Sequence, residues 1–129
     1  MTSIPGKLRA LVRERDEFRC QRCARFIGSG ARSLHHRRPR GMGGSRYANT
    51  AANLILVCGT GTSSGGCHSI IEGSRTLAER YGFLVRQGHD PATKPVFRYL
   101  RTWAIPTDTG WIPADPPEGF ETTTEGDAA

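Results

Sequence analysis

The chain has 129 residues, of which 36% are hydrophobic and 16 are glycine, so we expect one domain with a small core. It contains no run of 18 apolar residues, which argues against a helix that spans a membrane. Its first 16 residues mix apolar with charged side chains, unlike a secretory signal. We therefore expect a cytoplasmic protein without a membrane partner.

Charge is unevenly distributed along the chain. Residues 1–50 carry 12 Lys and Arg against 3 Asp and Glu, a net charge of +9, whereas residues 101–129 carry 1 against 6, a net charge of −5. Sixteen of the 18 basic residues are arginine, whose planar guanidinium matches the oxygens of phosphate. The basic half is therefore either a solvated surface or a nucleic-acid-binding surface, and the motifs within it must decide between the two.

The first expected element is an amphipathic helix over residues 5–16, because apolar residues recur there at helical spacing after a proline. A Cys-x-x-Cys turn and a Gly/Ser-rich loop follow. Residues 33–38 have the pattern of a strand, and a glycine-rich loop over residues 39–53 separates them from a short apolar strand at residues 54–58.

A second helix is expected over residues 67–82, where apolar side chains again recur at helical spacing. Gly82 is a suitable C-terminal stop for this helix, and Gly73 weakens the helical pattern locally. Residues 83–87 and 95–100 are expected to form the two strands of a small ribbon.

The end of the chain differs in composition from the rest. From about residue 107 it is rich in Pro, Thr, Gly and acidic residues, a composition that is typical of disorder. We therefore predict a domain over residues 1–106 and a flexible acidic tail over residues 107–129.

Four cysteines form two pairs that suit one zinc ion. Cys20 and Cys23 have the spacing with which one tight turn offers two thiolates to a tetrahedral Zn²⁺, whereas eight residues separate Cys58 from Cys67. Stretching that loop fourfold costs about 1.2 kcal/mol of closure entropy. This cost is small beside the roughly 10 kcal/mol that a structural zinc contributes. The alternatives are free buried thiols and, less suited to a chain without an export signal, disulfides.

Three histidines and an asparagine complete the pattern. His35 and His36 open the glycine-rich loop, and Asn53 lies 17 residues after His36. His68 directly follows the last cysteine. Because neighbouring residues on a strand face opposite ways, His35 and His36 either have different functions or include one bystander.

This ordered set resembles the HNH endonucleases, or ββα-metal nucleases, and particularly their small phage-encoded members. Those proteins show a Cys-x-x-Cys knuckle, then Asp-His or His-His before a proline and Gly-Gly, then Asn-Leu, then a second knuckle that ends in Cys-His. Here the matching segments read CQRC, HHRRPRGMGG, NL and C…CH, and the resemblance covers about residues 18–90. It implies an α+β fold in which an N-terminal helix and a zinc-stapled knuckle accompany a ββα-metal core.

The resemblance assigns a role to each residue of the site. His36 matches the general base, a task that suits an imidazole because its pKa lies near working pH. His35 and His68 match ligands of a catalytic divalent ion. Asn53 matches a residue of the catalytic motif that holds the histidine strand in place.

Glu72 departs from the colicin nucleases, which the resemblance also includes, because those carry a histidine at this place. It follows His68 by one helical turn, so its carboxylate could complete the ion site. An oxygen ligand would favour Mg²⁺ or Mn²⁺ over zinc, and Ni²⁺ is a further candidate ion. The alternative is a surface acid paired with an arginine such as Arg75.

The function that the resemblance implies is hydrolysis of DNA phosphodiesters by a metal-dependent endonuclease. Arg37, Arg38 and Arg40 are candidates to hold DNA phosphates. The small phage relatives are often associated with terminase, which suggests a role in DNA packaging within the host cytoplasm. One alternative is a zinc-ribbon DNA-binding module without catalysis, which explains the cysteines and the charge but not the ordered histidines. Another is a metal store, which needs no basic surface.

Overall fold

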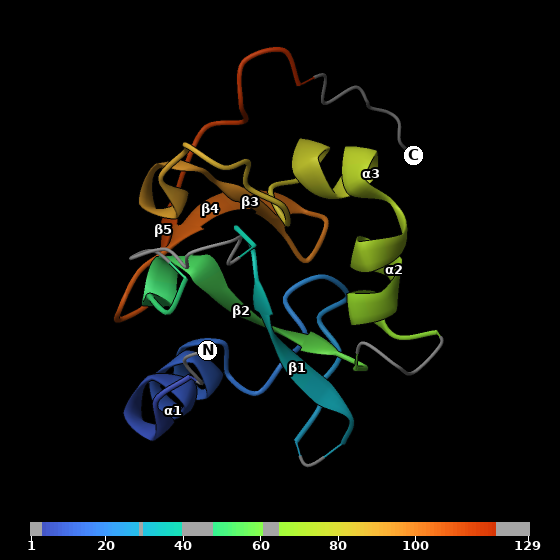
Figure 1. Ribbon diagram of the computed structural model, residues 1–129, viewed down its shortest axis with the longest axis vertical. Coiled ribbons are helices and arrows are strands. Elements are labelled where there is room, and N and C mark those ends of the chain that lie inside the picture. Colours follow the sequence, from blue (N-terminus) through green and yellow to red (C-terminus); the bar gives the residue numbers. More distant parts are fainter. Residues whose placement is uncertain (1–3, 29, 40–47, 61–64, 121–129) are drawn as a thin grey trace.

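The structure, a computed structural model, describes residues 4–28, 30–39, 48–60 and 65–120 (Figure 1). Within these residues the fold is α+β, with three α-helices and two antiparallel sheets. The helices are α1 (Gly6–Arg15), α2 (Cys67–Gly73) and α3 (Arg75–Arg80), and 3₁₀ turns occur at Ala51–Asn53 and Pro91–Thr93. The strands are β1 (Arg32–His36), β2 (Leu54–Cys58), β3 (Val96–Arg98), β4 (Thr102–Pro106) and β5 (Trp111–Pro113). None of the helices in the described part of the chain is long and apolar enough to cross a bilayer.

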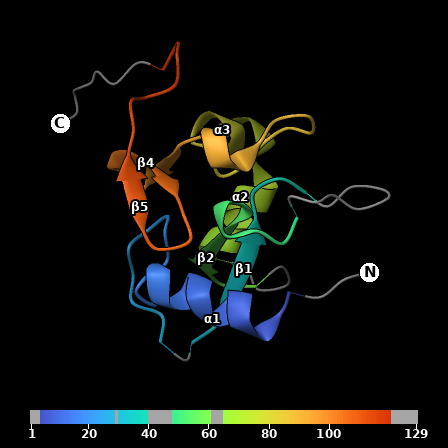
Figure 2. The ribbon, with the colours of Figure 1, turned by 90° about the vertical axis from the view of Figure 1, so that its left-hand side faces the viewer.

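Strands β1 and β2 form a two-stranded sheet at the centre of the molecule. Their antiparallel register pairs His35 with Ile55 and His36 with Leu54. All five residues of β2 are buried, because α1 contacts this strand and α2 contacts both strands. Figures 1 and 2 show α1 and α2 on different sides of the hairpin. The apolar run of residues 54–58 is thus the buried strand that its composition predicted.

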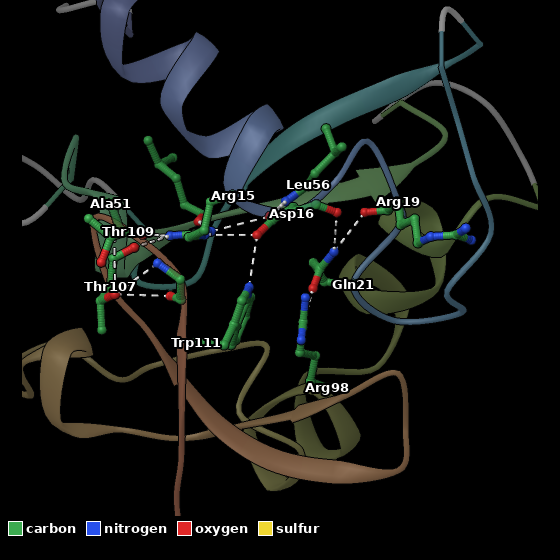
Figure 3. A network of polar contacts seen from close by, with 12 residues as sticks. Arg15, Asp16, Arg19, Gln21, Ala51, Leu56, Arg98, Thr107, Thr109 and Trp111 are labelled. Carbon is green, nitrogen blue, oxygen red and sulfur yellow. Dashed lines mark hydrogen bonds and ion pairs between the residues drawn. The ribbon is translucent and has the colours of Figure 1, made fainter.

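The remaining strands form a second sheet in the order β3-β4-β5. A buried ion pair joins this sheet to the first one (Figure 3). At the end of α1, the guanidinium of Arg15 donates to the carboxylate of Asp16 at 2.8 Å and to the carbonyl of Leu54 at 2.6 Å. The Asp16 carboxylate accepts hydrogen bonds from the backbone N–H of Leu56 and from the indole N–H of Trp111, at 2.9 and 3.0 Å.

These partners compensate the burial of two charges, which would otherwise be costly. Burial raises the pKa of the Asp16 carboxyl, whereas the Arg15 side chain and the N–H donors act in the opposite direction. Helix α1, strand β2 and strand β5 are therefore held together at one point.

The predicted helix over residues 5–16 and the predicted strand over residues 54–58 are confirmed by α1 and β2. The strand predicted over residues 33–38 is confirmed as β1, except that it ends at His36, and Arg37 and Arg38 lie outside it. The single helix predicted over residues 67–82 is wrong, because α2 ends at Gly73 and α3 begins at Arg75. Between them, Ser74 has an extended backbone, with φ −143° and ψ 91°. The glycine before Ser74 is a weak helix former, and the chain changes direction at this point.

The ribbon predicted from residues 83–87 and 95–100 is also wrong. Residues 83–87 form no strand in the structure, and β3 pairs with β4 instead. The N–H groups of Phe83 and Leu84 both bond to the carbonyl of Ala78, closing the end of α3 rather than extending a ladder.

The domain boundary at residue 106 is wrong for residues 107–120. Strand β5 continues the sheet, with Ile112 opposite Ile105, and Trp111 reaches the buried Asp16. A composition rich in Pro, Thr and Gly does not reveal that a single tryptophan finds a buried partner. The rest of the predicted tail, residues 121–129, lies outside the described residues.

Candidate metal centres

The four cysteines lie close enough to hold one metal ion. Their sulfur atoms all lie within 4.8 Å of one another, and the Sγ atoms of Cys23 and Cys58 are 3.9 Å apart. Cys20, Cys58 and Cys67 are buried, whereas Cys23 is exposed. The turn before β1, the end of β2 and the start of α2 thus meet at a sulfur cluster.

Several donors point at these sulfurs. The backbone N–H groups of Arg22 and Cys23 bond to the sulfur of Cys20 at 3.4 and 3.5 Å. The N–H of Cys67 bonds to the sulfur of Cys58 at 3.4 Å, and the guanidinium of Arg22 lies 3.5 Å from the sulfur of Cys67. Such donors favour thiolate over thiol, and thiolate is the form that binds metal. Without an ion, the contact with the Cys67 sulfur and burial raise the pKa of Cys20 to about 12, while the contacts with Cys20 and Arg22 lower the pKa of Cys67. The cluster therefore has the chemistry of a metal site.

His35 lies in β1 and is buried against the segment that follows α3. Its Nε2 atom is 2.7 Å from the carbonyl oxygen of Phe83. Because a carbonyl only accepts, Nε2 carries the proton and Nδ1 retains its lone pair. Burial lowers the pKa of His35 to about 4, so the ring is neutral at pH 7. A neutral imidazole held by a carbonyl at one nitrogen is the usual state of a metal ligand.

A hydroxyl group orients His68 in a similar way. The Ser33 hydroxyl is 2.7 Å from the carbonyl of Gly59 and 3.4 Å from Nδ1 of His68. The carbonyl takes the single hydroxyl proton, so Ser33 accepts a hydrogen bond from Nδ1–H of His68. The other ring nitrogen of His68, Nε2, lies 3.6 Å from a carboxylate oxygen of Glu72.

His35, His68 and Glu72 form a second group that could hold a metal ion. One ligand atom from each lies within 4.8 Å of the other two. The two imidazole rings meet edge to face, with centroids 5.6 Å apart. Glu72 contacts His68, and no ion pair with Arg75 occurs among the residues that the structure describes. Two imidazoles and a carboxylate are a suitable ligand set for a divalent ion.

A pocket of about 420 Å³ opens beside this group. It is lined by Leu34, His35, His36, Pro39, His68, Ile71, Glu72, Arg75, Ala78 and Leu84. His36 is the last residue of β1, and its Nε2 atom is 3.1 Å from the side-chain oxygen of Asn49. Although neighbouring residues of a strand face opposite ways, His35 and His36 both line this pocket. Their different partners distinguish them.

Asn53 connects the two ends of the glycine-rich loop. It is completely buried, and its side-chain oxygen accepts the N–H of Arg38 at 2.6 Å. Its amide nitrogen donates to the carbonyls of Arg38 and Ala48, each at 3.1 Å. The residue thus fixes the chain just after the histidine strand without entering the pocket.

The prediction that Arg37 holds DNA phosphate is wrong. Its side chain is completely buried, and its guanidinium donates to four backbone carbonyls. These acceptors belong to Gly82, Ala52, Pro91 and Lys94, at 2.9, 3.0, 3.1 and 2.6 Å. Burial lowers the pKa of Arg37 to about 9. Arg37 is therefore a structural crosslink, inaccessible to a ligand.

The two other predicted phosphate contacts have different surroundings. Arg38 is half-buried, and its guanidinium donates to the side chain of Gln87 at 3.1 Å. Arg40 lies outside the described residues. Arg75 is exposed and lines the pocket of the histidines. The sequence had suggested this residue only as a partner for Glu72.

Sequence reasoning also missed three groups that orient the histidines. Ser33 lies two residues before His35, so the period of a strand could have placed it on the same face. Asn49 and the carbonyl of Phe83 carry no comparable signal, because they approach from distant loops and one of them is a backbone atom.

Comparison with known proteins supplies no relative for this chain. No family model matches it, and the searches of curated proteins and of solved structures give no significant match. Function must therefore be argued from the residues and geometry described above.

The buried position of Arg37 leads to a stability prediction. Replacing Arg37 by Met should lower the free energy of unfolding by about 3 kcal/mol or more, because several buried carbonyls lose their donor. Arg37→Lys should also destabilise the fold, because an ammonium group cannot reach four acceptors at once. Urea unfolding followed by circular dichroism measures both effects.

Arg101→Met is the matched control, since Arg101 is exposed and should change stability by less than about 0.5 kcal/mol. An Arg37→Lys variant with unchanged stability but weakened DNA binding would contradict the structural role.

Proposed function

We propose that the protein is a metal-dependent DNA endonuclease of the HNH type. The observation that carries this proposal is the convergence of His35, His68 and Glu72 within 4.8 Å beside a pocket that His36 also lines. Two antiparallel strands followed by a helix supply these residues, which is the ββα order of the nucleases that the motifs resemble. The net charge of +6 supplies electrostatic attraction to DNA.

We assign Zn²⁺ to the sulfur cluster. Four cysteine sulfurs within 4.8 Å suit the tetrahedral all-thiolate coordination of structural zinc. An ion there would join the Cys20–Cys23 turn to β2 and α2. It would thereby hold the helix that carries His68 against the strand that carries His35.

The residues of the pocket divide the reaction between them. His36 is the proposed general base, which takes a proton from water as the oxygen attacks phosphorus in line. His35, His68 and Glu72 would bind a divalent ion such as Mg²⁺, Mn²⁺ or Ni²⁺, which supplies Lewis-acid stabilisation of charge on the phosphate and the leaving 3′ oxygen. Asn53 keeps His36 in position by fixing the chain beyond β1.

The cations around the pocket would hold DNA. Arg75 lines the pocket itself, and Arg38 lies just beyond the histidine strand. Arg40 is the third proposed phosphate contact. The resemblance to small phage nucleases extends the proposal to DNA packaging, with terminase as partner and the host cytoplasm as location. Co-purification of the two proteins from infected cells tests that extension.

A zinc-ribbon DNA-binding module without catalysis is the competing proposal. It uses the same sulfur cluster and the same positive charge. It gives no role to the convergence of two imidazoles and a carboxylate at a pocket, so the nuclease accounts for more of the structure.

The sulfur cluster should contain about one tightly bound zinc per chain. Cys20→Ser should unfold the protein or make it insoluble, because zinc binding contributes folding free energy of roughly 10 kcal/mol. Elemental analysis of purified protein, together with circular dichroism, measures both outcomes. A folded sample that contains no metal would refute the zinc assignment.

The two adjacent histidines should respond differently to substitution. His36→Ala should slow nicking of supercoiled plasmid by roughly 100-fold or more while ion binding persists, because a general base is no ligand. His35→Ala should weaken binding of the catalytic ion, and excess ion should partly restore nicking. Nicking assays and calorimetric titration with Mn²⁺ measure these effects.

The exposed His89 offers a control, and His89→Ala should match the wild type. Equal loss of ion affinity in the His35 and His36 variants would reverse or remove the assignment of base and ligand. No nicking by wild-type protein with any of Mg²⁺, Mn²⁺, Ni²⁺ or Zn²⁺ would favour the module without catalysis.

Glu72 should determine which ion activates the enzyme. Glu72→Ala should raise the Mg²⁺ concentration needed for half-maximal nicking and leave DNA affinity intact, since removal of an exposed acid does not weaken binding to DNA. Glu72→His should shift the preference toward Ni²⁺ or Zn²⁺, which favour nitrogen ligands. Metal titrations of nicking rate measure both, with Glu14→Ala as control on the exposed surface of α1. An unchanged Mg²⁺ titration for Glu72→Ala would exclude Glu72 from the site.

A further inference from the structure

Residues 18–28, here called the arginine knuckle, form a tight hairpin on the sulfur cluster. Arg19 and Phe26 pair as an antiparallel bridge, and the N–H of Cys20 donates to the carbonyl of Arg25 at 2.8 Å. At the base of the hairpin, the N–H of Ile27 donates a hydrogen bond to the carbonyl of Phe18 at 2.8 Å. Several backbone hydrogen bonds therefore fix the positions from which the side chains of the knuckle project.

Phe26 presents its ring to solvent from this hairpin. It is 62% exposed, the highest value among the large hydrophobic side chains of the described residues. The guanidinium of Arg19 lies over the ring, 5.9 Å from its centroid. A single exposed phenylalanine is ordinary by itself. Phe26 differs from such a residue because arginines and a pocket lie beside its ring.

The knuckle carries three cations in close succession. In the part of the chain that the structure describes, Arg19, Arg22 and Arg25 form no ion pair with a carboxylate. Arg22 turns toward the sulfur of Cys67, whereas Arg19 and Arg25 are exposed. The acid of the same segment, Glu17, is exposed and is not paired with them. The exposed positive charge of Arg19 and Arg25 beside an aromatic ring suits a polyanion that also has flat rings.

A pocket of about 350 Å³ opens beside the ring. It is lined by Arg25, Phe26, Ile27, Gly30, Ala31, Cys58, Gly59, Gly65 and Gly66. Four of these nine lining residues are glycines, and Gly66 packs so closely on Gly59 that a Cβ atom there would lie 2.6 Å from the Cα of Gly59. Walls without side chains allow the close approach of a flat ligand.

We propose that the arginine knuckle binds an unpaired nucleotide of DNA. The base stacks on Phe26 and enters the adjoining pocket, and the neighbouring phosphates contact Arg19 and Arg25. Stacking on an aromatic ring tolerates any base, because each base has a π face, and the arginines follow the backbone.

This site goes beyond the proposed nuclease and does not require hydrolysis. The pocket beside Phe26 shares no lining residue with the pocket that contains His35 and His68. The protein should therefore prefer DNA that contains an unpaired segment over continuous duplex, whether or not it cuts either one.

The test measures the affinity of the protein for two labelled DNAs by fluorescence anisotropy, without added divalent ions. One is a single-stranded oligothymidylate of 20 nucleotides, and the other is a hairpin duplex. Phe26→Ala should weaken binding of the single strand by roughly 5- to 150-fold, the range that removal of one stacked base covers, and leave duplex affinity within about twofold. Phe26→Tyr should retain single-strand affinity. The fluorescence of a Phe26→Trp variant should be quenched by the single strand and not by the duplex.

Ile112→Ala is the matched control, since Ile112 is 56% exposed on the second sheet and should have no effect. Combined Arg19→Ala and Arg25→Ala should flatten the salt dependence of single-strand binding, lowering the logarithmic slope by about 0.7 for each phosphate that is no longer neutralised. Metal content and circular dichroism confirm that each variant is folded. The proposal is overturned if folded Phe26→Ala binds the single strand like the wild type, or loses affinity for strand and duplex equally.

Discussion

The convergence of four cysteine sulfurs is the constraint on which the rest of the arrangement depends. Cys67 and His68 are neighbours in the chain, so a bond network that fixes the first also places the second. The same cluster holds the end of β2, whose register with β1 places His35. A short helix of seven residues would be unstable alone, and α2 is supported by its contacts with β1, β2 and α3. The two candidate metal centres therefore share helix α2 and the sheet formed by β1 and β2.

Hydrogen bonds from outside the two groups complete the pocket. The carbonyl of Phe83 holds Nε2 of His35, and the hydroxyl of Ser33 holds Nδ1 of His68, so that each ring is oriented by a group outside the cluster. Burial keeps His35 neutral, as a ligand must be. Asn53 fixes the chain beyond the strand through three hydrogen bonds. The chemistry proposed for the pocket therefore depends on these surrounding groups as much as on the proposed ligands.

Arginine has two separate uses in this protein. Arg15 and Arg37 are buried and join backbone carbonyls from distant segments, a task that suits a guanidinium with five donors. Arg19, Arg25 and Arg75 are exposed and are available to a polyanion. The positive charge of the first half of the chain therefore overstates the surface that can contact DNA. Among the described residues, Arg75 lies at the pocket of the histidines, and Arg19 and Arg25 lie at the knuckle.

The sequence by itself determined the features that depend on neighbouring residues. Helical spacing predicted α1, the apolar run predicted β2, and the cysteine spacing indicated which sulfurs would share a site. Tertiary structure decided what depends on distant partners. Arg37 is buried among carbonyls that lie 15 to 57 residues away in the chain. Trp111, in a segment whose composition is typical of disorder, donates a hydrogen bond to Asp16. Residues 83–87 were predicted as a strand, but the first two of them close the end of α3. Local patterns record the periodicity of a backbone, but the burial of a polar group depends on acceptors that only the folded chain brings within reach.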